Sequence, residues 1–200
     1  TVDTPPDRPR PAAVPPTGRW YAVLAPAEGL EIAFGLRVDG KAGKLSGALV
    51  NGASESRFTS VSWDGETLTL GLDHYDGRLA ARVEGGSLVG TFTRATPTGK
   101  FELPFRAVRT APAFPKPAKG SPSVAGDWGV EMGEGEKSER LLATFRQDGG
   151  RAAGTLLGST GDFGPMNGTW DGKALSLTVF DGVFFYRLDG TLYAAGAFTG

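Results

Sequence analysis

His74 is the only histidine in this 200-residue chain, and it is the side chain best suited to titrate near neutral pH. Asp73, Tyr75 and Asp76 flank it, and a neighbouring carboxylate could orient it as a general base. No serine or cysteine nucleophile motif accompanies His74, and the matching region of the second half has no histidine. We therefore favour a histidine in a turn at the rim of a sheet.

Acidic residues offer two further kinds of chemistry. Asp162, Asp171 and Asp181 could supply the paired carboxylates of glycoside hydrolysis. Each abuts a glycine or lies in a turn segment, where aspartate is favoured because it hydrogen-bonds the local backbone, so we predict turn residues. A second acidic segment could bind calcium, but its spacing matches no dedicated calcium loop, and a solvated surface is the simpler interpretation. This segment contains Glu131, Glu134, Glu136, Lys137, Glu139 and Arg140.

The composition excludes several functions. The chain has no cysteine, which excludes thiol catalysis, disulfides and thiolate metal sites, and one histidine excludes a multi-histidine metal site. The net charge is −1, with 21 basic and 22 acidic residues mixed along the chain, so the basic surface that nucleic acids require is lacking. No apolar segment approaches the ~20 residues that span a bilayer. We expect no cofactor, no bound metal and no membrane insertion by these residues.

The elements that would position these residues occur twice. Trp63-Asp64-Gly65 recurs as Trp170-Asp171-Gly172, and Gly18-Arg19-Trp20 corresponds to Gly126-Asp127-Trp128. Matched positions lie 107 to 109 residues apart, so the chain contains an internal repeat of one unit. The predicted domains are residues 18–109 and 124–200, preceded by a proline-rich disordered tether at residues 1–17 and joined by a stiff proline-rich linker at residues 110–123.

Both units consist of short alternating apolar runs separated by turn residues, with no credible helix. Asp39-Gly40, Asn51-Gly52 and Asp76-Gly77 are among the predicted turns. The eight strands predicted for the first unit cover residues 20–24, 32–38, 45–50, 58–63, 68–72, 79–83, 88–93 and 101–107. The seven of the second unit cover residues 128–132, 141–147, 152–157, 166–170, 174–180, 183–188 and 192–199.

This pattern predicts an all-β fold: a tandem pair of small antiparallel up-and-down β-barrels of about eight strands. Closure removes exposed sheet edges, and glycines inside strands, such as Gly35, Gly47, Gly71 and Gly90, permit tight curvature. An open two-sheet sandwich is the alternative. The second unit lacks a counterpart of the strand at residues 101–107, which leaves an open seam. We expect the chain to continue past Gly200, or another segment to fill the gap.

Aromatic residues are the remaining candidates for binding. Aromatic side chains at a barrel mouth could stack on a flat ligand, although packing into the barrel floor is the interpretation that we favour for the tryptophans. The candidate ligand-binding residues are Trp20, Trp63, His74, Tyr75, Trp128 and Trp170. Val183 to Tyr186 carries large apolar side chains on both faces of one strand, which predicts a cover by the other barrel or by a further domain. Phe184 and Tyr186 are therefore candidate interface residues, unless one aromatic is simply buried and the other half-exposed.

Five short motifs resemble the β-rich N-terminal region of extracytoplasmic TlpA-like thioredoxin-family proteins. They are Asn51-Gly52, Leu68-Thr69-Leu70 leading to His74-Tyr75, Leu88-Val89-Gly90-Thr91-Phe92, Thr160-Gly161-Asp162-Phe163 and Phe180-Asp181-Gly182. The resemblance covers residues 18–200 and implies an exported bacterial protein, periplasmic or membrane-tethered. The Cys-x-x-Cys pair of that family is absent, so no catalytic residue is carried over, and the redox domain is implied to lie outside this chain. A weaker similarity to avidin and lipocalin barrels concerns the fold alone.

Together these observations predict a non-catalytic accessory or binding module that precedes a thioredoxin-like thiol–disulfide or peroxiredoxin-type domain. The alternative is a calycin-like carrier that holds a small apolar ligand in one barrel lumen. Lumen volume distinguishes the two, because a barrel of ~8 strands is either filled by its own side chains or holds one small ligand. An enzyme is a third possibility, which intrinsic hydrolase activity lost on His74→Ala would favour.

Overall fold

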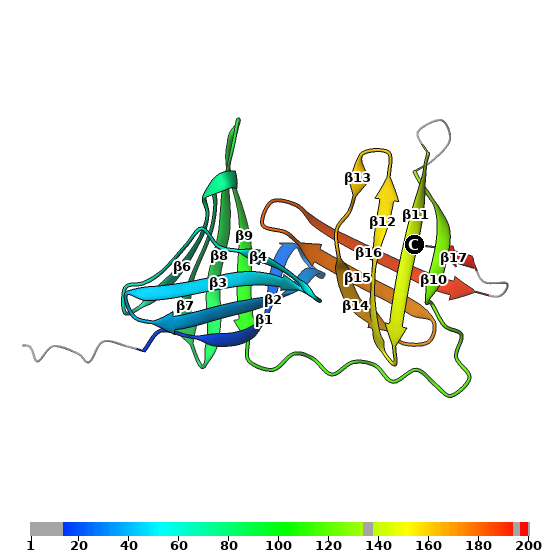
Figure 1. The fold of residues 1–200 in the computed structure, drawn as a ribbon, viewed down its shortest axis with the longest axis horizontal. Coiled ribbons are helices and arrows are strands. Elements are labelled where there is room, and N and C mark those ends of the chain that lie inside the picture. The colour runs from blue at the N-terminus through cyan, green and yellow to red at the C-terminus, as the bar shows by residue number, and fades with distance from the viewer. Residues whose placement is uncertain (1–13, 134–137, 194–196, 200) are drawn as a thin grey trace, which may run out of the picture.

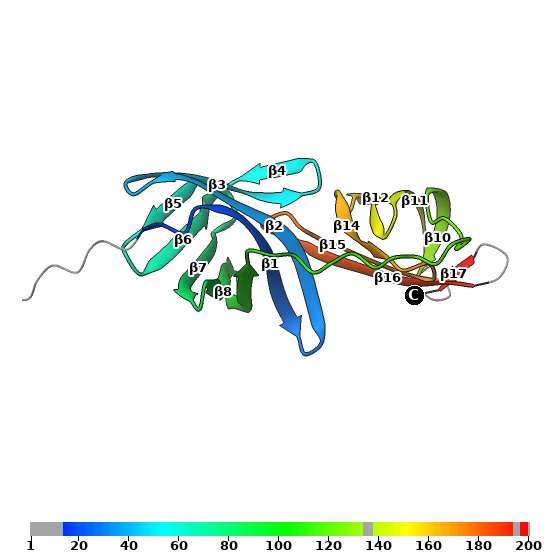
Figure 2. The same ribbon diagram turned by 90° about the horizontal axis from the view of Figure 1, so that it is seen from below.

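The computed structural model describes residues 14–133, 138–193 and 197–199. Its regular structure is almost entirely β, in two antiparallel sheets that curl around separate hydrophobic cores (Figures 1 and 2). Within the described ranges, helical structure is confined to a three-residue 3-10 turn, η1 (Asp73–Tyr75). The predicted all-β fold of two units is confirmed.

The first sheet has nine strands in the order β4-β3-β2-β1-β9-β8-β7-β6-β5. Neighbouring strands in this order follow one another along the chain, apart from β1 and β9, whose pairing places Ala22 opposite Ala107. The strands are β1 (Gly18–Ala27), β2 (Leu30–Lys41), β3 (Lys44–Asn51), β4 (Ser54–Arg57), β5 (Ser60–Trp63), β6 (Thr67–Leu72), β7 (Gly77–Glu84), β8 (Ser87–Thr96) and β9 (Gly99–Val108).

The two ends of this sheet meet at Phe58 and Thr59, which connect β4 to β5. The N–H of Phe58 donates to the Gly47 carbonyl (3.0 Å), and the N–H of Thr59 donates to the Gly71 carbonyl (2.9 Å). Because β4 pairs with β3 and β5 pairs with β6, this short connection joins both edges of the curled sheet.

The predicted turn at Asp39-Gly40 is wrong. Strand β2 continues through it, because the ladder with β3 pairs Asp39 with Ser46 and Gly40 with Leu45, and the chain reverses only after Lys41. A continuous ladder satisfies backbone groups that an earlier turn would leave unpaired. The requirement for glycine inside strands is confirmed at Gly90, where a Cβ atom would collide with the carbonyl oxygen of Ala80 on the neighbouring strand.

The second sheet follows the order β10-β11-β12-β14-β15-β16-β17, with β13 pairing to β12. Its strands are β10 (Gly126–Met132), β11 (Glu139–Asp148), β12 (Arg151–Gly158), β13 (Gly161–Asp162), β14 (Met166–Trp170), β15 (Ala174–Phe180), β16 (Phe185–Tyr193) and β17 (Ala197–Thr199). The strand that would correspond to β9 of the first unit has no counterpart among the described residues.

The predicted break between strands 183–188 and 192–199 is also wrong. Strand β16 runs through Asp189-Gly190, because its ladder with β15 extends to the pair of Ala174 with Thr191. The Asp189 carboxylate is occupied by an ion pair with Arg187, 2.6 Å away on the same strand, instead of forming a turn. The last described strand therefore begins only at Ala197 and is three residues long.

The segment between the units lies along the second unit (Figure 1). Val124 is fully buried in the second core, and the Arg151 guanidinium lies 4.5 Å from the centre of the Phe114 ring. The described residues of this segment, from residue 109 to residue 125, form no strand. Of the N-terminal tether, residues 1–13 lie outside the described part of the chain.

Candidate functional site

The repeated Trp-Asp-Gly motif forms a turn. The Oδ1 atom of Asp64 accepts the backbone N–H groups two and three residues later, at 2.9 and 2.7 Å, and Asp171 repeats this at 2.8 and 2.6 Å. Hydrogen bonds from the N–H groups of Thr67 and Ala174 are the main reason that the pKa of each carboxyl is lowered. Asp181 forms the same turn, with both distances at 2.7 Å. The prediction that these aspartates serve turns is confirmed.

Asp162 is also engaged locally, since it accepts the backbone N–H of Gly164 at 2.7 Å. In the acidic segment, Glu139 accepts both the N–H and the hydroxyl of Ser159, at 2.7 and 2.6 Å, and the hydroxyl contributes most to lowering the pKa of Glu139. Glu131 is exposed on β10. Glu134, Glu136 and Lys137 lie outside the described residues, so the predicted solvated surface there stays a prediction.

Trp20 and Trp128 hold the chain as it enters each unit. Trp20 is buried, and its Nε1–H donates to the carbonyl of Pro16 at 3.1 Å; Trp128 is half-buried and donates to the carbonyl of Val124 at 2.9 Å. In each bond the tryptophan and the carbonyl residue are four positions apart, so the two units share this hydrogen bond as well as the tryptophan. The Arg109 guanidinium also lies 3.4 Å from the centre of the Trp20 ring. These contacts support the packing interpretation for both tryptophans.

Trp170 is fully buried, and its Nε1–H donates to the Pro122 carbonyl at 3.2 Å. Its counterpart Trp63 is half-buried and lines an open surface cleft of about 470 Å³. The cleft walls mix acidic, basic and apolar groups, and across them Arg82 lies 3.6 Å from Glu66. The other lining residues are Val14, Gly65, Val83 and Glu84.

His74 and Tyr75 lie in η1, at the opposite end of β6 from Trp63. Neither is buried, and the Tyr75 side chain is 53% exposed. The structure thus distributes the candidate ligand-binding residues over two units and over both ends of one strand, and it does not gather them into a single site. The position of His74 at a rim turn agrees with the interpretation that we favoured.

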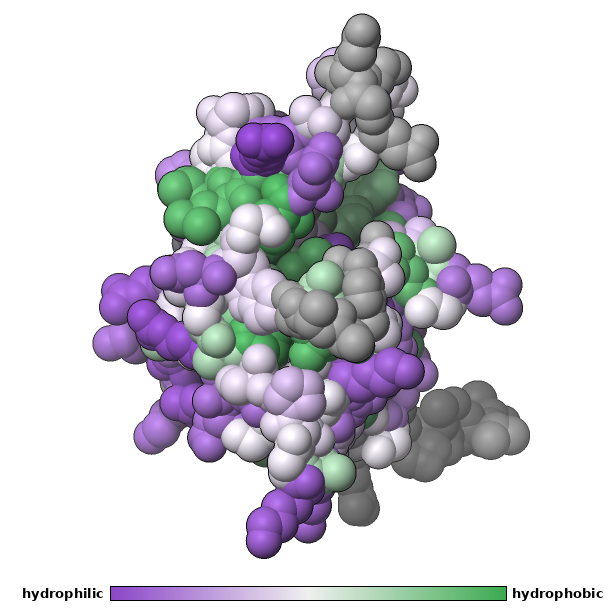
Figure 3. Space-filling view, turned by 90° about the vertical axis from the view of Figure 1, so that its right-hand side faces the viewer, coloured by the Kyte–Doolittle hydropathy of each residue, from purple (hydrophilic) through white to green (hydrophobic). Residues whose placement is uncertain are grey.

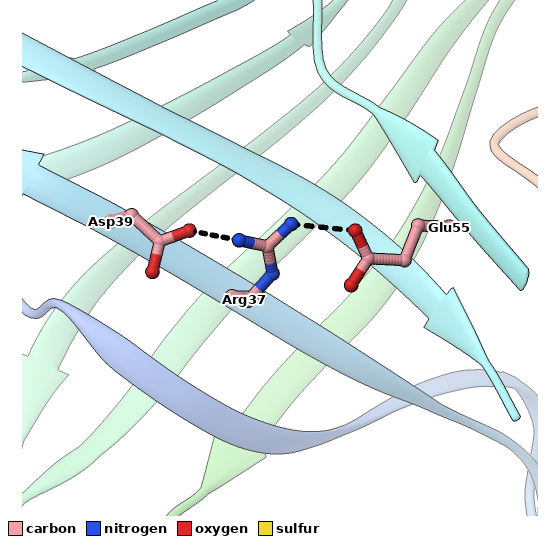
Figure 4. A network of polar contacts seen from close by, with 3 residues as sticks. All are labelled: Arg37, Asp39 and Glu55. Atoms are coloured by element: carbon pink, nitrogen blue, oxygen red, sulfur yellow. Dashed lines mark hydrogen bonds and ion pairs between the residues drawn. The ribbon is translucent and has the colours of Figure 1, made fainter. Parts of the chain in front are cut away.

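A charged network lies on the outer face of the first sheet. Arg37 on β2 contacts Asp39 at 2.5 Å and Glu55 on β4 at 2.6 Å, bridging across β3 (Figure 4). The hydrogen bond with Glu55 is the main reason that the pKa of Arg37 is raised. All three side chains are partly exposed, so the network links strands at the surface.

The two units share one side chain. Phe180, the last residue of β15 in the second unit, is fully buried in the core of the first unit. The centre of its ring lies 5.0 Å from that of Phe34 and 5.0 Å from that of Phe92, the latter in an edge-to-face arrangement. The second unit therefore inserts an aromatic side chain into the hydrophobic core of the first.

Hydrogen bonds next to Phe180 hold the end of β15 in place against the first unit. The side chain of Asn51, which is itself buried, donates through Nδ2 to the Phe180 carbonyl at 2.9 Å. The Thr178 hydroxyl donates to the carbonyl of Ala33 (2.8 Å) and accepts the N–H of Ala33 (3.2 Å). Because β3 begins to pair with β2 only at Gly35, Thr178 occupies the place that a neighbouring strand would take at Ala33.

Matching turns of the two units meet at this junction. A Cβ atom on Gly77 would lie 3.5 Å from the carbonyl oxygen of Gly182, which lies in the turn that joins β15 to β16. Gly182 has a φ of +106°, and a Cβ there would lie 3.0 Å from Leu72. Arg94 donates to the Val183 carbonyl at 2.8 Å. The end of the first unit is thus covered by the β15–β16 turn.

The segment with the candidate interface residues contacts the first unit through Phe185, a residue that the sequence analysis did not choose. Phe185 stacks on Phe101 of the first unit with ring centres 6.2 Å apart, whereas Phe184 is 56% exposed and stacks on Tyr186. Tyr186 packs against the second core and against Phe163. Side chains alternate along a strand, so Phe185 faces the first unit and its two neighbours do not. Phe184 and Tyr186 stay candidates for an interface with a further domain.

Sequence reasoning missed the junction residues Phe180, Thr178 and Asn51. One available signal was the large aromatic residue that directly precedes the predicted turn at Asp181-Gly182, because such a side chain beside a turn needs a packing partner. The partner could not be identified from the sequence, because Thr178 and Ala33 are 145 residues apart.

The interior of the first unit is filled by side chains, including Phe180 from the second unit. Leu49, Leu88 and Phe92 have no exposed surface, and the other inward-facing leucines are nearly as buried. A cavity large enough for a ligand would leave the side chains around it accessible to a water-sized probe. In the second unit Trp170 and Leu177 are likewise fully buried.

The chain matches no protein-family model, no curated protein and no solved structure. Among the described residues, no helix has both the length and the apolar character needed to cross a membrane. No group of three or more histidine, aspartate or glutamate side chains in the same ranges is placed to hold a metal ion.

Proposed function

We propose that this chain is a non-catalytic binding and spacing module of an exported bacterial protein, and that it holds a thioredoxin-like domain at a fixed position. The observation that carries this proposal is the insertion of Phe180 into the core of the first unit. Domains joined by a linker usually move relative to one another unless their interface is large and hydrophobic. A shared core side chain, held by buried polar contacts, opposes such motion and suits a spacer.

The thioredoxin-like partner is supported by the short motifs described above and by the composition. A thiol–disulfide reaction needs a cysteine pair, and this chain has no cysteine, so that chemistry would belong to a domain outside it. The module would position that domain or engage its client. Phe184, which is exposed beside the junction, offers an apolar contact for either.

The carrier alternative receives less support. A carrier needs a lumen that admits its ligand, and the inward-facing side chains of the first unit bury one another. The cleft at Trp63 is open, has charged walls and lies outside the core, which does not suit a small apolar ligand.

Two experiments test the proposal. The coding sequence after Gly200 should continue into a domain with a Cys-x-x-Cys pair, and a stop codon there would contradict the partner. Rigidity can be measured with spin labels on Glu66→Cys and Arg140→Cys, one in each unit, because the chain has no other cysteine to label. We expect a narrow distance distribution that broadens when Phe180→Ala is added. A broad distribution in the parent protein would refute the spacer role.

A further inference from the structure

We propose that the exposed edge of β10 is a docking site for one antiparallel β-strand of a partner polypeptide. The strand would carry apolar side chains at alternate positions with a cationic side chain between them. This inference goes beyond the spacing role and holds whatever domain the module positions. Addition of a strand to a free sheet edge is a common mode of peptide recognition, in which the backbone supplies affinity and alternate side chains supply specificity.

Within the part of the chain that the structure describes, no strand pairs with the outer edge of β10. Two inward-facing positions of β1, Ala22 and Leu24, are buried, whereas the matching positions of β10 are half-buried at Val130 and exposed at Met132. Leu24 has no exposed surface, while Met132 is 46% exposed, although both side chains are apolar and of similar size. The difference lies in their surroundings, because β1 has β9 beside it, whereas β10 is the last strand of its sheet among the described residues.

The first unit also shows what the missing strand looks like. On β9, Phe105 pairs with Leu24 and Ala107 pairs with Ala22, and both β9 side chains are buried. Transferred to the second unit by the repeat, the same register would place the two apolar side chains of a docked strand opposite Met132 and Val130. Figure 3 shows hydrophobic residues reaching the surface at this end of the second unit.

Charge favours a cationic partner strand over a second copy of this chain. The outward-facing charged residues of β10 are Asp127 and Glu131, both exposed. In the transferred register the position of Arg106, between Phe105 and Ala107, falls opposite Glu131, because Arg106 pairs with Val23 in the first unit. Pairing of two β10 edges would instead bring acidic residues together, and like charges on adjacent strands repel.

A peptide with the sequence of β9, Gly99–Val108, is the probe. We expect it to bind the protein, and we expect Glu131→Lys to weaken binding about fivefold to tenfold by reversing the cross-strand charge pair. The matched control Glu66→Lys, an exposed glutamate of the first unit, should stay within about twofold, as expected for an exposed charge away from the site. A peptide carrying Phe105→Asp should not bind. Absence of binding would overturn the proposal. Binding that Glu131→Lys leaves unchanged would overturn it too, because the peptide would then have replaced β9 in the first unit.

A disulfide tests the register. A Met132→Cys protein, oxidised with a peptide in which cysteine replaces Phe105, should form a mixed disulfide, because opposite residues on paired strands have Cβ atoms about 4.5–5.5 Å apart. A peptide with cysteine in place of Glu102, which faces outward, should react at least tenfold more slowly. Equal reaction of both peptides would refute the register. If the Met132→Cys protein instead forms disulfide-linked homodimers, the strand at the β10 edge comes from a second copy of this chain, and the proposed partner strand is refuted.

Discussion

Replacement of Phe180 by alanine should weaken the junction between the units, because the second unit inserts this side chain into the core of the first. The side chain is fully buried between Phe34 and Phe92, and truncation of a buried phenylalanine costs about 3–5 kcal/mol through lost burial and the cavity left behind. We expect the free energy of unfolding to fall by about 3–4 kcal/mol, near the lower end because water can fill a cavity at a junction. For a chain of this size, that corresponds to a decrease in Tm of roughly 10 °C.

Phe184→Ala is the matched control, since it removes the same side chain from the same turn. Phe184 is 56% exposed and stacks only on Tyr186 among the described ring contacts, so we expect a cost below about 1 kcal/mol. A third variant, Phe180→Leu, keeps most of the apolar volume and should restore about half of the loss.

Calorimetry and urea unfolding followed by tryptophan fluorescence would measure these effects. Each unit contains two tryptophans, so both report. We expect one cooperative transition in the parent protein and two resolved transitions in Phe180→Ala, because each unit then unfolds around its own core. Equal costs for Phe180→Ala and Phe184→Ala would refute the claim that Phe180 joins the units.

Three further substitutions test the turns and the junction. Thr178→Val keeps the shape but removes the hydroxyl that serves both backbone groups of Ala33, and should cost about 1–3 kcal/mol in urea unfolding. Gly182→Ala should cost about 1–3 kcal/mol in the same assay, because φ is +106° and the new methyl group would press on Leu72. Asp171→Ala should destabilise the protein above the ordinary carboxyl pKa, about 4, where the charged turn contacts are fully present. Because the folded pKa is lowered, that difference should disappear in unfolding measurements as the pH falls through the lowered pKa.

Local patterns in the sequence predicted local structure well. Alternating apolar residues located the strands, and repeated tryptophans located matching positions in two units. Aspartate before glycine correctly indicated turns at Asp64, Asp171 and Asp181, where the carboxylate binds its own backbone. The same dipeptide failed at Asp39, and the strand break predicted after residue 188 failed as well, because in both places a neighbouring strand carries the ladder onward. The preference of Asp-Gly for a turn stabilises the fold less than several backbone hydrogen bonds of a ladder do.

Contacts between the units could not be predicted in the same way. A period of two tells which residues share a face of a strand, but not which other sheet will cover that face. This is why Phe184 and Tyr186 were chosen in place of Phe185, one position away. It is also why the missing strand could be counted from the sequence, while its consequence, the exposure of Met132 on β10, required the structure.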